Sequence, residues 1–360
     1  MRTFHCTVCE QMVFFENSLC LHCLSGLGFD PDRREVVTVV LEEPLDSGAV
    51  RRVGDDKLAT DEPVQYRCTN DVIAKCNWLV PAPGKLCVSC ALTQTRPDDG
   101  DDGALAEFAD AEAAKRRLVF TLLELRLPIE GHRTKPDGGL AFDLLSPGKR
   151  PVQTGHADGV ITLNLDEAND AHREQVRSQM GEPYRTLLGH FRHEVGHYYW
   201  PIVIEQTGLI DDYRKLFGDE REDYGKALER HYEEGPPVDW AKSHVSSYAT
   251  MHPWEDWAET WAHYLHIVDT SQTAAAHELQ TDLARPGDTT DLGFRMTLRN
   301  WIPFTYAMNA ICRSMGIADL YPFVITKDVI TKLVFVDRAV TSARFAAAKK
   351  AAAQVPAPPA

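Results

Sequence analysis

The stretch "FRHEVGHYYW", residues 191–200, holds two histidines four positions apart, with a glutamate directly after the first. In an α-helix, residues four apart lie on one face, one turn from each other. His193 and His197 could therefore direct ring nitrogens at one Zn²⁺ ion, with Glu194 beside it. Glu194 could take a proton from a zinc-bound water and pass it to a leaving amine. The alternative is a half-buried helix with hydrogen-bonded histidines.

A zinc site of this kind needs a third protein ligand. The extended pattern H-E-x-x-H-x-x-G-x-x-H is excluded, because Trp200 and Val203 occupy its glycine and third histidine positions. Downstream, residues 252–266 read "HPWEDWAETWAHYLH", in which Glu255 and Glu259 share one face of a predicted helix. One carboxylate could bind zinc while the other orients a ligating histidine. The remaining candidates for the third ligand are Asp256, His252, His263 and His266.

Eight of the nine cysteines lie in the first 90 residues, and Cys312 stands alone. In a reducing compartment, paired cysteines are typical of metal sites rather than disulfides. The spacing predicts two closed structural zinc sites, whose ligands are Cys6, Cys9, Cys20 and Cys23 in the first and Cys68, Cys76, Cys87 and Cys90 in the second. The alternatives are iron in a rubredoxin-like site, pairing across the two quartets, and substitution of a cysteine by the neighbouring His5 or His22.

The HEVGH stretch, followed by Glu255-Asp-Trp-Ala-Glu259, resembles the gluzincin metallopeptidases in their variant with E-x-x-A-E on the second helix. This resemblance implies that Glu255 is the third zinc ligand and that Glu259 orients a ligating histidine. Several such enzymes carry S-x-Y-A before the ligand glutamate, and Tyr248 in "SSYAT" stands seven residues before Glu255. Tyr248 would then donate its phenol hydrogen to the oxyanion. From Cys6 to about residue 340, the chain resembles the bacterial zinc-binding metallopeptidases that join a zinc-ribbon region to a gluzincin-like domain.

The predicted fold class is α+β, with a cysteine-rich region of short strands followed by a mainly helical metallopeptidase domain with a small sheet. The expected divisions are a zinc-ribbon region at 1–93, an acidic linker at 94–103, a zincin-type domain at 104–344 and a disordered tail at 345–360. Residues 159–165, "GVITLNL", alternate as a half-buried strand does. This strand is expected to be either the edge strand that pairs with an extended peptide or a plain structural strand.

The formal net charge of −15 disfavours general binding to nucleic acids or anionic membranes. No apolar run reaches the length of a membrane span and no signal-peptide pattern is present, so the cytoplasm is the expected location. The predicted function is zinc-dependent hydrolysis of a peptide or protein substrate, with one catalytic and two structural zinc ions. The alternatives are a non-enzymatic adaptor that recruits a protein partner through its zinc ribbons, and an amidohydrolase acting on a non-protein amide.

Overall fold

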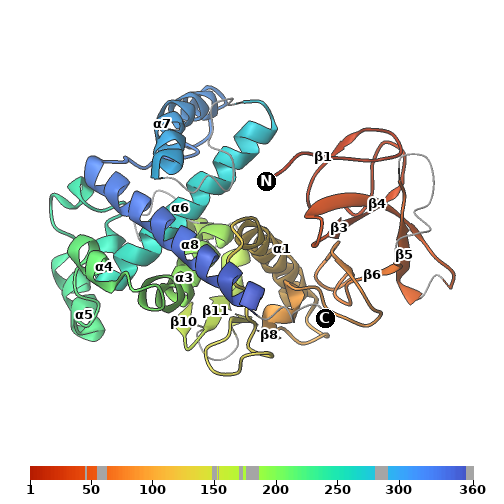
Figure 1. Cartoon of the computed structure of the whole chain (residues 1–360), viewed down its shortest axis with the longest axis horizontal. Helices are drawn as coiled ribbons and strands as arrows, with labels where there is room; N and C mark the ends of the chain where they lie inside the picture. Colours follow the sequence, from red (N-terminus) through yellow and green to blue (C-terminus); the bar gives the residue numbers. More distant parts are fainter. Residues whose placement is uncertain are drawn as a thin grey trace, which may run out of the picture.

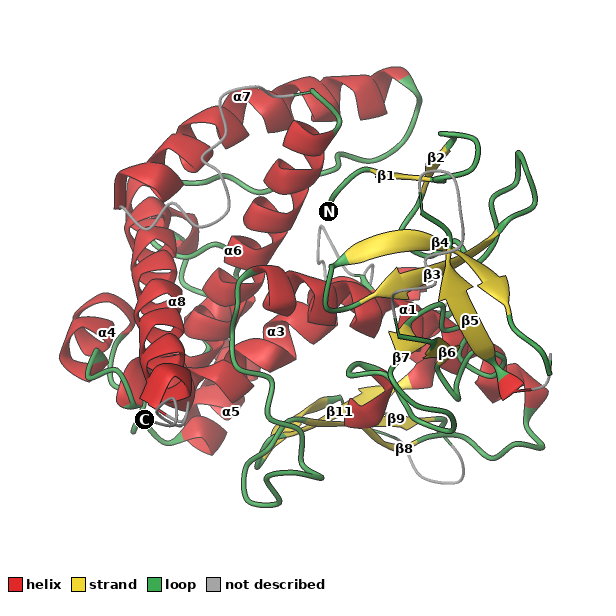
Figure 2. Cartoon of the chain, turned by 45° about the vertical axis from the view of Figure 1, so that its right-hand side comes forward, coloured by secondary structure: helices red, strands yellow, loops and turns green. Residues whose placement is uncertain are grey.

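A computed structural model describes residues 1–44, 47–54, 63–147, 152, 154–169, 173–175, 186–279 and 291–353 of the chain. Figure 1 shows the cysteine-rich strands on one side, the long helices on the other, and helix α1 between them. Figure 2 shows the same division by secondary structure, with the strands gathered near α1. This combination of small sheets and long helices confirms the α+β fold class.

Short strands build the cysteine-rich region. Strand β1 (Phe4–His5) pairs with β2 (Met12–Val13). An antiparallel sheet follows, in the order β3 (Gly26–Asp30), β4 (Glu35–Leu41), β5 (Ala49–Arg52), β6 (Gln65–Arg67) and β7 (Leu79–Val80). One side of this sheet buries a small apolar cluster of Val37, Val39, Val50 and Leu79. Other buried residues of this region, among them Phe15, Phe29 and Trp78, belong to the larger apolar cluster that also contains Phe120 of the long helix at residues 102–124.

A second sheet lies beside the long helices. Its order is β10 (Gly155–Ala157), β11 (Val160–Asn164), β9 (Ala141–Leu145) and β8 (Thr93–Thr95). The predicted strand in residues 159–165 is therefore present as β11. Of its two expected roles, the edge strand is wrong, because β11 lies between β10 and β9, and the plain structural strand agrees with the sheet order. Asp158 and Gly159 both have positive φ values, which suit a two-residue hairpin turn. This turn folds β10 back onto β11, so β10 occupies the edge, and no described strand pairs with its outer side.

Side-chain caps mark the start of the helices that carry the core. The Asp101 carboxylate accepts a hydrogen bond from Ala104 N at the start of α1 (Asp102–Glu124). The Thr186 hydroxyl accepts one from Gly189 N at the start of α3 (Leu187–Trp200). Helix α6 (Pro253–Ala276) begins with a proline, whose fixed φ suits the first turn. The other described helices are α4 (Ile210–Phe217), α5 (Tyr224–Glu234), α7 (Asp291–Ser314) and α8 (Lys327–Ala353).

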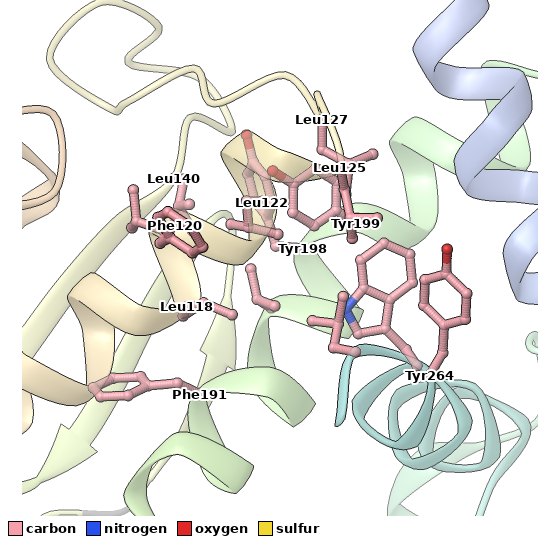
Figure 3. Close-up of a cluster of buried hydrophobic side chains, with 14 of the residues drawn as sticks. Leu118, Phe120, Leu122, Leu125, Leu127, Leu140, Phe191, Tyr198, Tyr199 and Tyr264 are labelled. Atoms are coloured by element: carbon pink, nitrogen blue, oxygen red, sulfur yellow. The ribbon is translucent and has the colours of Figure 1, made fainter. Parts of the chain in front are cut away.

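Helices α1, α3 and α6 share one apolar core. Figure 3 shows Leu118, Phe120 and Leu122 of α1 near Phe191 and Tyr198 of α3, and Tyr264 belongs to α6. The Trp257 Nε1 group donates a hydrogen bond of 2.9 Å to Gly196 O, which ties α6 to α3. A Cβ atom at Gly196 would lie 3.1 Å from Ala258 Cα, so the absence of a side chain permits this close helix approach.

Two expected boundaries differ from the structure. The expected linker 94–103 overlaps two elements. Gln94 and Thr95 belong to β8, which pairs with β9, and residues 102–103 belong to the first turn of α1. In the expected disordered tail 345–360, α8 continues through Ala353, since alanine and lysine have high helix propensity. Residues 354–360 lie outside the described residues. Within the described part of the chain, no helix is long and apolar enough to cross a membrane.

Candidate metal centre

Helices α3 and α6 bring three predicted ligands together. One donor atom each from His193, His197 and Glu255 lies within 4.8 Å of the others. The His193 Nε2 atom is 3.0 Å from Glu255 Oε2, and the His197 Nε2 atom is 3.4 Å from Glu255 Oε1. A tetrahedral zinc ion with bonds of about 2.0–2.1 Å separates its nitrogen and oxygen ligands by about 3.3 Å. The spacing of these atoms therefore fits a shared zinc ion.

The environment of Glu255 also fits a metal. This residue is 2% exposed, and its Oε2 atom has no partner among the described residues other than the His193 Nε2 atom at 3.0 Å. A buried carboxylate is costly unless a cation or hydrogen-bond donors compensate for the water that it has lost. Two imidazoles and one carboxylate are a common ligand set for zinc that retains an open coordination position. A zinc ion at this point would bind this oxygen and the His193 Nε2 atom together.

Glu259 lies one helical turn after Glu255 and contacts the other side of the His193 ring. Its Oε1 atom is 2.7 Å from His193 Nδ1. A hydrogen bond there would place the proton on Nδ1 and direct the Nε2 lone pair toward the metal position. Burial opposes protonation of His193, but the carboxylates of Glu255 and Glu259 outweigh it and raise the pKa of this histidine well above its ordinary value. Zinc requires the neutral ring, so metal binding would release a proton.

The predicted base and oxyanion donor lie beside this cluster. Glu194 is 8% exposed and directly follows His193 on α3. Tyr248 begins the short helical turn Tyr248–Thr250, and its ring centre is 6.1 Å from that of His193. Burial raises the pKa of Tyr248 well above its ordinary value, so its phenol keeps the hydrogen that it would donate.

The other candidates for the third ligand have different partners. The Asp256 carboxylate is 2.5 Å from Lys332 Nζ. His252 caps α6, where its Nδ1 atom accepts a hydrogen bond from Trp254 N. His263 Nδ1 lies 2.7 Å from the Tyr321 hydroxyl, and the ring centre of His266 lies 6.0 Å from that of Trp301. None of these four residues belongs to the cluster of His193, His197 and Glu255.

Two residues at this centre were not predicted from the sequence. The Tyr224 hydroxyl, at the start of α5, donates a hydrogen bond of 3.0 Å to Glu255 Oε1. His156, on the edge strand β10, stacks on His197 with ring centres 6.2 Å apart. Burial lowers the pKa of His156 to about 4, with a further contribution from His197, so its ring is neutral at pH 7. Neither residue belongs to a motif, because each reaches the centre through the tertiary fold.

The first cysteine quartet forms a compact cluster between β1 and β3. The sulfurs of Cys6 and Cys23 are 3.6 Å apart, as are those of Cys9 and Cys20. Zinc with bonds of about 2.3 Å separates four tetrahedral thiolates by about 3.8 Å, so the spacing fits one ion. Both Cys-x2-Cys loops close with the same backbone hydrogen bond, 2.8 Å long, to the carbonyl of the first cysteine. The neighbouring His5 and His22 side chains are exposed and lie outside the cluster.

The second cysteine quartet is more deeply buried. Its residues, each 2% exposed or less, are Cys68, Cys76, Cys87 and Cys90. The Cys76 and Cys87 sulfurs are 3.7 Å apart, which again fits a tetrahedral ion. The structure groups each quartet by itself, without pairing cysteines across the two. Beside the second cluster, α1 carries a fully buried ion pair between Glu112 and Lys115, and Cys90 Sγ lies 3.6 Å from Glu112 Oε2.

Comparisons with known proteins agree with both parts of the chain. The "Uncharacterized protein Mb2598c" of Mycobacterium bovis and the "Uncharacterized protein Rv2568c" of Mycobacterium tuberculosis are each 49% identical to it over 342 residues. Each alignment covers 93% of this chain and 94% of the relative. No solved structure matches the chain.

Two family models match successive segments. Residues 3–101 match a zinc-ribbon domain. Residues 104–339 match a family described as "Putative zinc-binding metallo-peptidase". The second match covers more than half of the 360 residues and agrees with the family resemblance of the sequence. The chain therefore belongs to this zinc-binding metallopeptidase family and carries an N-terminal zinc-ribbon domain.

Proposed function

We propose that the chain is a zinc-dependent peptidase whose catalytic ion is held by His193, His197 and Glu255. The observation that carries this proposal is the convergence of two histidine Nε2 atoms on a buried carboxylate, at 3.0 Å from Oε2 and 3.4 Å from Oε1. Two further zinc ions would bind the cysteine quartets and have structural roles, because four thiolates leave no position for substrate. The proposed content is three zinc ions per chain.

The chain's own groups would divide the chemistry between them. When bound, zinc would lower the pKa of a water molecule and polarise the substrate carbonyl. Glu194 would accept the proton of the attacking water at its carboxylate and return it to the leaving amine. Tyr248 would donate its phenol hydrogen to the developing oxyanion. Glu259 would hold the His193 ring in the orientation that metal binding requires.

The substrate is proposed to be an extended peptide. The outer side of β10 has no paired strand among the described residues, and His156 of this strand stacks on His197. A peptide that added to this edge would pair its backbone with β10 and pass beside the metal centre. The exact bounds expected for the zinc-ribbon region and the zincin-type domain, and the cytoplasmic location, stay predictions from the sequence.

The proposal is tested with wild-type protein and the Glu194→Gln variant. Both are incubated with peptides from a whole-cell digest, and new termini are detected by mass spectrometry. Wild type should generate new termini, and Glu194→Gln should lower kcat by about 10²–10⁴-fold, the usual contribution of a general base. Both should contain three zinc ions by metal analysis, whereas Glu255→Ala should contain two.

The rival functions correspond to different outcomes. Hydrolysis of small non-protein amides, with no new peptide termini, would indicate the amidohydrolase. A content of two zinc ions with no turnover of any amide would indicate the adaptor. The assignment of the cysteine quartets would be contradicted by a content near one zinc ion per chain together with cysteines that are readily alkylated in the native protein.

A further inference from the structure

Tyr224 makes a direct contact with the proposed ligand Glu255 that the peptidase mechanism above does not use. Its hydroxyl donates a hydrogen bond of 3.0 Å to Glu255 Oε1. The other carboxylate oxygen, Oε2, lies 3.0 Å from the His193 Nε2 atom and accepts no hydrogen bond from a phenol. The two oxygens of one carboxylate therefore have different environments, because each lies near a histidine nitrogen but only Oε1 accepts a hydrogen bond from Tyr224.

The backbone around Tyr224 fixes the direction of this hydrogen bond. Asp223 caps α5, because its carboxylate accepts a hydrogen bond of 3.1 Å from Lys226 N. The His252 Nε2 atom lies 3.1 Å from Glu222 O, which ties the residues before α5 to the start of α6. The ring centres of Tyr224 and His252 are 5.2 Å apart. These contacts hold the tyrosine next to the first turn of α6, where Glu255 lies.

Packing of the fold does not explain the position of this hydroxyl. Tyr224 is 38% exposed, and Ala227 is the buried residue of α5. A tyrosine at the surface could direct its hydroxyl into water at no cost. Its hydroxyl instead reaches a carboxylate that is 2% exposed and also interacts with the Tyr248 side chain. The contact therefore serves Glu255 more than it serves the attachment of α5.

We propose that Tyr224 is a positioning residue that holds Glu255 Oε1 and leaves Oε2 as the single oxygen that binds zinc. This inference rests on the proposed function, because it treats Glu255 as a zinc ligand. Without the phenol, the Glu255 side chain could rotate, and both oxygens would compete for the ion. Groups that orient a metal ligand typically contribute about 10–100-fold to metal affinity.

Tyr224 and Tyr248 are neighbours with different proposed roles, and this difference makes the inference testable. Tyr248 would act on the substrate oxyanion, so Tyr248→Phe should retain zinc and lower kcat by about 10²-fold. Tyr224 would act through Glu255, so Tyr224→Phe should weaken zinc binding. The matched control is Tyr306→Phe, which removes the same atom from a tyrosine on α7 that is 76% exposed.

The experiment measures zinc affinity by competition with a chromophoric chelator, using full-length protein in which the cysteine sites remain loaded. Tyr224→Phe should raise the Kd of the remaining zinc about 10–100-fold, while Tyr306→Phe and Tyr248→Phe should match wild type. The Tm of protein without this zinc should be the same in all three variants.

Three results would overturn the inference. They are a wild-type Kd in Tyr224→Phe, a fall in kcat with zinc affinity unchanged, and a lower Tm of the Tyr224→Phe protein without this zinc. If wild type itself binds no zinc beyond the cysteine sites, the proposed function fails instead, and the two failures are therefore distinguishable.

Discussion

The cysteine clusters and the His193–His197–Glu255 cluster differ in what holds their ligands in place. The cysteines lie in loops around strands as short as two residues, such as β1 and β2. The histidines and the glutamate lie on α3 and α6, which pack closely through Gly196 and Trp257. We therefore expect metal to stabilise the fold of the cysteine-rich region, and we expect the helical fold to position the ligands of the His193–His197–Glu255 cluster before metal binds.

The clusters also differ in the space that they leave around an ion. Four thiolates complete a tetrahedral site, as expected for structural zinc. Three donors leave one position open, and Glu194 and Tyr248 lie next to it in the proposed arrangement. Removal of a ligand should therefore affect folding at one kind of site and chemistry at the other.

The largest expected effect is that of Cys76→Ser. Structural zinc contributes an apparent free energy of about 10–16 kcal/mol in small zinc domains, which is comparable to the whole stability of a typical domain. The variant should lose one zinc ion, and amides in residues 63–95 should exchange hydrogen for deuterium much faster. His193→Ala should also lose one zinc ion but keep wild-type exchange in that region. Both outcomes are measured by metal analysis and hydrogen–deuterium exchange mass spectrometry.

The matched control is Cys312→Ser, since Cys312 is also buried but lies outside both quartets. It should retain all zinc and wild-type exchange in residues 63–95. The proposed roles of the two kinds of metal site would be reversed if His193→Ala unfolded the whole protein while Cys76→Ser had no effect on hydrogen exchange.

A smaller effect is expected from Phe120→Ala, which tests whether the cysteine-rich region depends on α1 as well as on metal. The Phe120 ring on α1 lies 5.2 Å from that of Phe15 and 5.8 Å from that of Phe29. Removal of a buried phenylalanine side chain typically costs about 3–5 kcal/mol, because a cavity remains. Urea unfolding of zinc-loaded protein should show this loss of free energy.

The control is Arg117→Ala on the same helix, which removes an exposed ion pair with Glu16. Such pairs contribute at most about 1 kcal/mol. An equal loss in the two variants would show that aromatic packing does not join the two regions.

The residues of the His193–His197–Glu255 cluster could be proposed from the sequence, because the two histidines have a short helical spacing and the family resemblance selected Glu255 among the downstream candidates. His193 and His197 are one turn apart, and the carboxylates of Glu255 and Glu259 repeat that spacing on a second helix. The cysteine quartets were recognisable for a similar reason, since the Cys-x2-Cys loop is a local structure. In both cases the short spacing identifies pairs of residues, whereas the approach of α3 to α6 that brings Glu255 to the histidines does not follow from it.

Contacts between distant segments could not be predicted in this way. Tyr224 lies 31 residues before Glu255 and reaches it through the turn that precedes α5. The edge position of β10 depends on the hairpin turn at Asp158 and Gly159, although the alternation of β11 was visible in the sequence. Composition also led to a wrong expectation of disorder for residues 345–353. This alanine- and lysine-rich segment continues α8, but its sequence is also typical of a low-complexity chain end.

The smallest expected effect is that of Glu259→Gln, which tests whether the helical fold alone suffices to build the open centre. Glutamine can still accept a hydrogen bond from His193 Nδ1, but it has lost the negative charge that makes the imidazole a stronger ligand. Zinc affinity at this centre should fall about 10–100-fold, with the cysteine-bound zinc and the Tm of the protein without the catalytic ion unchanged. Glu35→Gln, at an exposed position on β4, provides the control. Competition with a chelator measures the affinity. If the zinc affinity of Glu259→Gln matched that of this control, the helices would position His193 without help from Glu259. The two regions would then differ more strongly, because the helical fold alone would build the open centre while the cysteine-rich region would depend on metal.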